Sequence, residues 1–326
     1  MNRRAFIAML GAAAWPLAAH GEPARGKVYR IGYLALAPEE DKSLMRPLLQ
    51  RLRELGYAEG ANMIFKYRSA EGQPERLAAL ASELVQDHPD VLIAGFGTLV
   101  AQAAKAATTT IPIVFTTVGD PLGAGIVSSL NRPGANVTGL TDQARDVQGK
   151  RLQLLLELVG DEHEIAVLLN PDTPFSRLSL EEAESAAHSR QIRLGVLEAR
   201  TADQVVRRVE EAVQNKAAGL LIMEDPVIYS VRRTIAELTA RFRLPAMYVY
   251  RDSAEVGGLM SYGPDRSHLY RRAAEYVDKI LNGAKTADLA VEQPTRFEFI
   301  INAKAAKAIG IEIPPSLLTL ADEVIE

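Results

Sequence analysis

The chain has 326 residues, of which 48% are hydrophobic and 24% are charged, and its formal net charge is -4. This length allows one large domain or two medium-sized domains, each with its own core. The negative charge argues against nucleic-acid binding and against a polybasic membrane anchor. The chain contains no cysteine, so we expect neither disulfides nor a lipid attached to a mature N-terminus.

The first residues have the anatomy of an export signal. Arg3 and Arg4 precede an uncharged apolar run at 5–19, and Ala19 and Gly21 supply small residues at the usual cleavage positions. The run is short for a spanning helix, which needs about 20 apolar residues. We predict a signal peptide at 1–21, and the arginine pair is also typical of the twin-arginine type. The predicted location is the periplasm.

Strand and helix patterns alternate through the first part of the chain. Strands are predicted at 28–34, 62–69, 91–94 and 111–117. Helices are predicted at 43–56 and from 74 onward, and a third one ends at 107. Thr98 is a possible N-cap of the third helix. This alternation is typical of a parallel sheet wrapped by helices.

The stretch 111–141 interrupts this alternation. It begins as a buried strand, turns at Gly119-Asp120-Pro121, and ends in a second extended run at 137–141 without an intervening helix. A parallel strand normally returns through a helix of ten or more residues. We therefore interpret the stretch as a crossing from one α/β lobe to another.

The alternation then restarts. Strands are predicted at 165–169, 192–197, 219–223 and 244–250, and helices at 146–159, 179–190, from 201, from 226, at 265–281 and at 303–310. Capping boxes are predicted at 179–182 and 201–204, and Asp225 and Asp265 are predicted N-caps. Two more extended passages, 255–263 and 292–302, fit neither repeat. The predicted fold is α/β, with two doubly wound parallel-sheet lobes joined by three hinge crossings.

The sequence carries no catalytic motif: G-x-S-x-G, H-E-x-x-H and a phosphate-binding Gly-Lys-Ser/Thr loop are all absent. The loop Gly95-Phe96-Gly97 lacks the third glycine of a dinucleotide site. The five histidines are scattered and supply no spaced set of metal ligands. We expect no catalytic residue, no metal and no cofactor.

Ligands of open α/β sheets bind beyond the carboxyl ends of the strands. The residues at these ends and on the crossings are therefore the predicted ligand-binding residues: Tyr33, Phe96, Gly97, Thr98, Thr117, Asp120, Thr141, Asn170, Asp225, Tyr250 and Tyr262. Several of them also have a purely structural explanation. Thr98 and Asp225 can serve as N-caps, Asp120 can either hold a ligand ammonium or stabilise its own turn, and the tyrosines can simply pack.

Long stretches of the chain resemble the substrate-binding proteins of ABC transporters, in the group that includes tryptophan- and tyrosine-uptake binding proteins. The matching stretches are RIGYL at 30–34, LRELGYAEG at 52–60, DPLGAGIVSSLNRPGANVTGL at 120–140, GGLMSYG at 257–263, RRAAEYVDKILNGA at 271–284, PTRFEFIIN at 294–302 and the segment 314–326. Phe96 and the residues at 251–253 (Arg-Asp-Ser) can give this chain a ligand pocket that differs from the pocket of the proteins that bind aromatic amino acids.

The resemblance implies a type I periplasmic binding fold, an ABC permease and ATPase as partners, and no bound nucleic acid. We assign 27–138 with 262–286 to an N-terminal lobe and 139–261 with 287–326 to a C-terminal lobe. The predicted function is capture of a small organic solute, an amino acid or an aromatic or acidic metabolite, by a monomer that delivers it to the permease.

Three alternative functions share the fold. A receptor that passes its ligand to a signalling partner is not separable from an uptake protein by sequence. A two-lobed α/β enzyme would need a nucleophile paired with a base, which the motifs do not supply. A transcription regulator would need a DNA-reading module before the first strand, where the sequence instead has an export signal.

Overall fold

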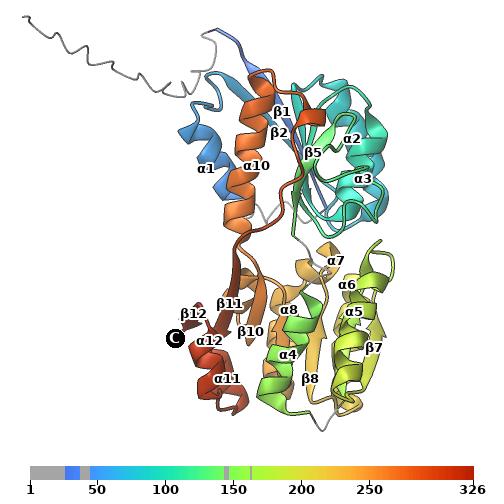
Figure 1. The fold of residues 1–326 in the computed structure, drawn as a ribbon, viewed down its shortest axis with the longest axis vertical. Coiled ribbons are helices and arrows are strands. Elements are labelled where there is room, and N and C mark those ends of the chain that lie inside the picture. The colour runs from blue at the N-terminus through green and yellow to red at the C-terminus, as the bar shows by residue number, and fades with distance from the viewer. Residues whose placement is uncertain (1–25, 37–44, 143–146, 162–163) are drawn as a thin grey trace, which may run out of the picture.

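The computed structural model describes residues 26–36, 45–142, 147–161 and 164–326, and it places them in two lobes, each built on its own sheet (Figure 1). The predicted signal peptide at 1–21 lies outside the described residues. None of the described helices is long and apolar enough to cross a membrane.

The sheet of the first lobe has five parallel strands in the order β2-β1-β3-β4-β5. The strands are β1 (Tyr29–Ala35), β2 (Met63–Ser69), β3 (Val91–Phe96), β4 (Ile113–Val118) and β5 (Val137–Thr141). The central strands β3 and β4 are buried along their whole length, as expected for a sheet covered on both faces.

Helices cover both faces of this sheet (Figure 1). They are α1 (Arg46–Glu54), α2 (Leu77–Gln86) after the short η2 (Pro74–Arg76), α3 (Thr98–Ala107), α10 (Arg266–Leu281) and η3 (Thr286–Asp288). One face packs on α1 and α10, and the other on α2 and α3. The first lobe therefore takes one of its helices, α10, from late in the chain.

The sheet of the second lobe has seven strands in the order β12-β11-β10-β9-β8-β6-β7. The strands are β6 (Ile165–Leu169), β7 (Leu194–Glu198), β8 (Gly219–Ile222), β9 (Ala246–Tyr248), β10 (Met260–Pro264), β11 (Phe297–Asn302) and β12 (Glu323–Ile325). Only the β10–β11 pair is antiparallel among the described pairs. The sheet is thus mixed, because the chain returns into it along β11 from the other lobe.

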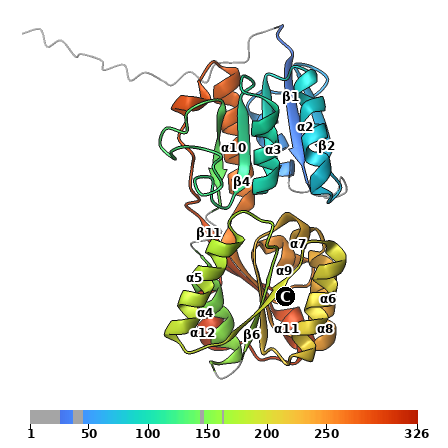
Figure 2. The same cartoon turned by 90° about the vertical axis from the view of Figure 1, so that its right-hand side faces the viewer.

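Helices also cover both faces of the second sheet (Figure 2). They are α4 (Gln148–Val159), α5 (Ser176–Ser189), α6 (Ala202–Gln214), α7 (Pro226–Ser230), α8 (Arg232–Phe242), α9 (Arg251–Glu255), α11 (Ala303–Ile309) and α12 (Pro315–Leu320). One hydrophobic core lies under α4, α5, α11 and α12, and a second lies under α6, α7 and α8.

Three segments join the lobes: the one after β5, the β10–α10 junction, and the one from η3 to β11. Hydrogen bonding of β5 to β4 continues to Thr141, and β10 remains in the second sheet to Pro264. Val291 still packs in the core of the first lobe. Each crossing therefore lies a few residues C-terminal to the predicted boundaries at 138, 261 and 286, because strand pairing extends past them.

Most predicted elements match the observed ones to within a few residues, with local exceptions. Helix α5 begins at Ser176, so the predicted capping box at Ser179 lies inside the helix. The single helix expected from 226 is divided at Val231 into α7 and α8. The predicted caps at Asp225, Asp265 and Thr201 are confirmed, since each side chain accepts a hydrogen bond from a backbone N–H of its helix.

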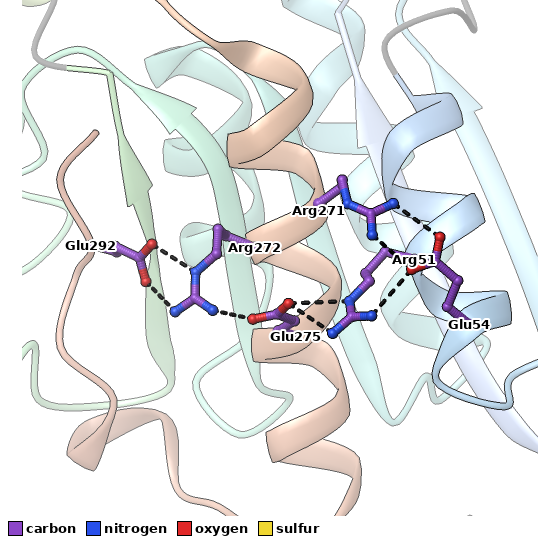
Figure 3. A network of polar contacts seen from close by, with 6 residues as sticks. All are labelled: Arg51, Glu54, Arg271, Arg272, Glu275 and Glu292. Carbon is purple, nitrogen blue, oxygen red and sulfur yellow. Dashed lines mark hydrogen bonds and ion pairs between the residues drawn. The ribbon is translucent and has the colours of Figure 1, made fainter. Parts of the chain in front are cut away.

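An ionic network ties α1 to α10 and to the third crossing (Figure 3). Its members alternate in charge, each one paired with the next: Arg271, Glu54, Arg51, Glu275, Arg272 and Glu292. Arg272 contacts Glu292 through two hydrogen bonds, of 2.7 and 2.6 Å. The backbone of Glu292 also pairs with Gly139 and Thr141 around the end of β5. The network therefore fixes the third crossing to the first lobe.

Candidate functional site

The carboxyl ends of strands from both lobes face one another, and the lobes touch at two glycines. A Cβ atom on Gly97, after β3, would lie 2.5 Å from Cγ of Pro226 in α7. A Cβ atom on Gly119, after β4, would lie 2.4 Å from Cζ of Phe175 in the second lobe. Only glycine permits approaches this close. The residues between the lobes are therefore packed against each other at these two points.

Beside the Gly97 contact, aromatic side chains from both lobes surround one arginine. Phe96 ends β3 in the first lobe, while Tyr229 in α7 and Tyr250 after β9 belong to the second. The rings meet edge to face with centroids 5.4–6.2 Å apart. The guanidinium carbon of Arg266, the first residue of α10, lies 4.0 Å from the Tyr250 ring centroid, 4.5 Å from Tyr229 and 5.5 Å from Phe96.

Arg266 also forms an ion pair with Asp252 in α9 and donates a hydrogen bond of 2.8 Å to the Tyr229 hydroxyl. Tyr229 in turn donates to the same carboxylate oxygen of Asp252. We call Phe96, Tyr229, Tyr250, Asp252 and Arg266 the Arg266 cluster. Burial on its own lowers the pKa of Arg266, but Asp252 and the neighbouring tyrosines together outweigh it, and the pKa lies well above its usual value. The arginine is therefore a fixed cation in a buried site.

A cavity of about 430 Å³ adjoins this cluster. Its lining comes from both lobes: Pro47 of α1 and Ser267 and Tyr270 of α10 on one side, and Tyr250, Asp252 and other residues of α9 and β11 on the other. A volume of this size fits a small organic ligand, which typically occupies 300–1,000 Å³. The lining combines aromatic rings with charged groups, so it suits a ligand that has both an apolar body and charge.

A second buried polar cluster lies where the first crossing meets the second lobe. Tyr250 donates a hydrogen bond of 2.7 Å to Asp142, and Glu224 follows β8 at the same place. Burial and the neighbouring Asp142 carboxylate raise the pKa of Glu224 well above its usual value, while Arg151 opposes this. Arg151 is fully buried and donates through Nε to the Tyr262 carbonyl at 2.7 Å. This cluster joins both ends of the first crossing to the second sheet.

The predicted residues of the first lobe lie at the strand ends, with different surroundings. Gly97, with φ of 109°, is the N-cap of α3, so the prediction of Thr98 as N-cap is wrong. The Oγ1 atoms of Thr98 and Thr117 are buried and have no hydrogen-bond partner among the described residues. Asp120 accepts from Gly123 N–H at 2.8 Å and thus closes its own turn. Thr141 donates to the Gly119 carbonyl at 3.4 Å.

The predicted residues Asn170 and Asp225 of the second lobe are brought together. The Asn170 amide donates to Asp225 at 3.0 Å, and the other carboxylate oxygen caps α7 at Val227 and Ile228. Thr173 donates the remaining hydrogen bond, of 2.6 Å. These contacts account for both carboxylate oxygens, so Asp225 has a clear structural role.

The tyrosines separate into two groups. Tyr250 is part of the Arg266 cluster and lines the 430 Å³ cavity, and it is the one predicted residue among the described lining. Tyr33 is buried in the first lobe, stacked on Tyr67 with ring centroids 5.7 Å apart. Tyr262 is half-buried and stacks on Phe297 at the β10–β11 pair. Neither lines the cavity.

Sequence reasoning missed Arg266 and Tyr229, and noted Asp252 only as a departure from the resembling proteins. Arg266 follows the N-cap of a predicted helix, where a charged residue normally indicates a solvated surface. The available signal was its position directly after a strand end on a crossing. The described residues contain no group of three or more His, Cys, Asp or Glu side chains that could hold a metal ion.

Known proteins resemble the chain over nearly its full length. The L-Trp complex of an ABC domain from Streptococcus pneumonia is 25% identical and covers 92% of this chain and 100% of its own, with a TM-score of 0.84. A ligand-free, open substrate-binding protein from Clostridium difficile is 26% identical, covers 91% of this chain and 99% of its own, and has a TM-score of 0.64. A tyrosine-binding protein of Clostridioides difficile (strain R20291) is 28% identical over 86% of this chain and 80% of that protein.

Two α/β lobes with a cavity between them define a two-lobed solute-binding protein of the type I periplasmic fold. Residues 42–325 match the ABC transporter substrate binding protein family, and the chain belongs to this family. Proteins of this family capture small solutes outside the cytoplasmic membrane for an importer. The family, fold and general function predicted from the sequence are confirmed.

Proposed function

We propose that this protein is the periplasmic component of an ABC importer and that it captures an amino acid, with the aromatic amino acids as the first candidates. The observation that carries the proposal is the 430 Å³ cavity, which residues of both lobes line beside the Arg266 cluster. The relatives named for tyrosine binding and solved with L-Trp support the choice of solute. The other predicted residues at the strand ends, including Thr98 and Thr117, remain candidate contacts for the solute.

Lobe closure is the proposed mechanism. The chain matches the Trp complex with a TM-score of 0.84 but the open, ligand-free protein with 0.64, at nearly equal sequence identity and coverage. This difference supports a lobe arrangement close to the liganded one. A solute that contacts both lobes favours the closed form over the open form, because only the closed form offers both sets of contacts. The signal peptide at 1–21 directs export of the protein, which acts as a monomer. The closed monomer then delivers the solute to the permease, which works together with the ATPase.

The test is a melting-temperature screen of the purified protein with amino acids, aromatic acids, nucleosides and sugars. A solute at one hundred times its Kd should stabilise the protein by about 2.7 kcal/mol. Titration calorimetry then gives Kd, and small-angle scattering follows closure. Fractionation of cells that express the full chain tests the periplasmic location. Melting temperatures that do not change across the whole library would contradict the proposal.

A further inference from the structure

The Arg266–Asp252 ion pair uses only one end of each partner. Arg266 donates through Nη2 to both Asp252 Oδ2 and the Tyr229 hydroxyl. Arg266 Nη1 and Asp252 Oδ1 are buried and have no hydrogen-bond partner among the described residues. A buried polar atom without a partner is costly and requires an explanation. The pair therefore leaves one donor nitrogen on the cation and one acceptor oxygen on the anion without a partner in the described part of the chain.

Both residues line the 430 Å³ cavity, and Arg266 is only 7% exposed. The tyrosines 250 and 270 supply apolar surface in the same lining. Four acidic residues and two arginines line the cavity in the described part of the chain, so its charge is net negative. A ligand with only a carboxylate meets repulsion there, whereas a ligand that also carries an ammonium group does not.

We infer that Arg266 and Asp252 together recognise the head group of a zwitterionic α-amino acid, the arginine binding its carboxylate and the aspartate its ammonium group. This inference rests on the proposed function and assigns two residues that set its specificity. The ligand completes a ring of alternating charges: carboxylate, Arg266, Asp252 and ammonium. Charge-assisted hydrogen bonds of this kind are about twice as strong as neutral ones, which favours a zwitterion over a sugar hydroxyl. The aromatic rings of the lining then contact the side chain of the amino acid.

The experiment compares three ligands on one protein by calorimetry. They are the L-amino acid that binds best in a screen of all L-amino acids, its analogue without the amino group, and its analogue without the carboxylate. Losing one charge-assisted contact should weaken binding to the wild-type protein about tenfold to a hundredfold. Asp252→Asn should abolish most of the discrimination against the deaminated analogue, and Arg266→Gln most of that against the decarboxylated analogue.

Asp172→Asn and Arg200→Gln are matched controls, because this Asp–Arg pair, at 3.2 Å, lies on the exposed surface of the second lobe. Both should keep the wild-type discrimination. Arg266→Lys retains the charge and should keep part of the discrimination even if Arg266→Gln does not fold. Wild-type discrimination against the deaminated analogue in Asp252→Asn, or against the decarboxylated analogue in a folded Arg266→Gln, would overturn the assignment while leaving amino-acid capture intact. Binding of sugars alone would overturn both the assignment and the amino-acid proposal, and no binding at all would contradict solute capture itself.

Discussion

The ring of Phe175, ahead of α5 in the second lobe, lies directly against the backbone of Gly119 in the first. A Cβ atom at residue 119 would be 2.4 Å from Cζ and 2.5 Å from Cε1 of this ring. The ring itself is only 3% exposed, so it has little room to move aside. Gly119 thus lets the two lobes meet, and an added methyl group there acts on the interface between them.

Gly119→Ala should therefore weaken solute binding by disfavouring lobe contact. Overpacking costs about 1–3 kcal/mol, which corresponds to a loss of affinity of about fivefold to a hundredfold. Calorimetry with the solute found in the screen measures this loss, and small-angle scattering measures the opening. Phe175→Ala provides the room, so Gly119→Ala in that background should have little further effect. Equal losses in both backgrounds would show that residue 119 acts within the first lobe only.

Glu224→Gln should increase stability more at alkaline than at acidic pH. Because the pKa of Glu224 is raised in the folded protein, mainly by burial, the folded state binds this proton more tightly than the unfolded state. Wild-type stability therefore falls as pH rises from the unfolded pKa, about 4.3, toward the folded value. The glutamine variant escapes this loss, so its advantage should be near zero at pH 4 and about 1 kcal/mol or more at pH 8.

Urea denaturation at both pH values measures the difference for Glu224. Glu157→Gln is the control, because Glu157 is exposed on α4 and surface changes of this kind stay within about 0.5 kcal/mol. If Glu224→Gln is less stable than the wild type at pH 8, then the ionised carboxylate contributes more through Arg151 than its burial costs.

Glu292→Gln should lower stability at neutral pH by about 1 kcal/mol, since it removes a two-point contact with Arg272 (Figure 3). The Arg272 hydrogen bonds lower the pKa of Glu292. Its contribution is therefore complete above the unfolded pKa and is lost as pH falls through the lower folded value. Chemical denaturation at pH 7 and at pH values below the unfolded pKa of about 4.3 should show the gap to the wild type narrowing only in the more acidic samples.

Glu181→Gln is the matched control for Glu292, because Glu181 pairs with Arg177 at 3.1 Å on an exposed helix surface. Its effect should be a few tenths of a kcal/mol at most. A cost at Glu292 that is no larger would mean that the third crossing does not depend on this network.

The fold was predictable because its signals are local. Alternating strands and helices, the missing helix between β4 and β5, and caps such as Asp225 all depend on residues close in sequence. The Arg266 cluster was not predictable in the same way. Phe96 meets Tyr229 and Arg266 only because the crossings bring two separate sheets together, and no spacing in the sequence records that distance. Asp225 was predicted to bind the ligand because it follows a strand end. It does lie there, but one of its carboxylate oxygens caps α7 and the other accepts hydrogen bonds from Asn170 and Thr173.

The two predicted capping boxes offer the sharpest local test. At Thr201 the hydroxyl accepts a hydrogen bond of 3.3 Å from Gln204 N–H, and the Gln204 side chain accepts one of 2.7 Å from Arg200 N–H. At Ser179, inside α5, the buried hydroxyl has no partner among the described residues. Thr201→Ala should therefore cost about 1 kcal/mol. Ser179→Ala should be neutral or stabilise slightly, because alanine has the higher helix propensity. Urea denaturation of both variants at pH 7 measures the contrast, and a larger loss at Ser179 than at Thr201 would mean that Ser179 is the N-cap and that α5 begins after it, not at Ser176.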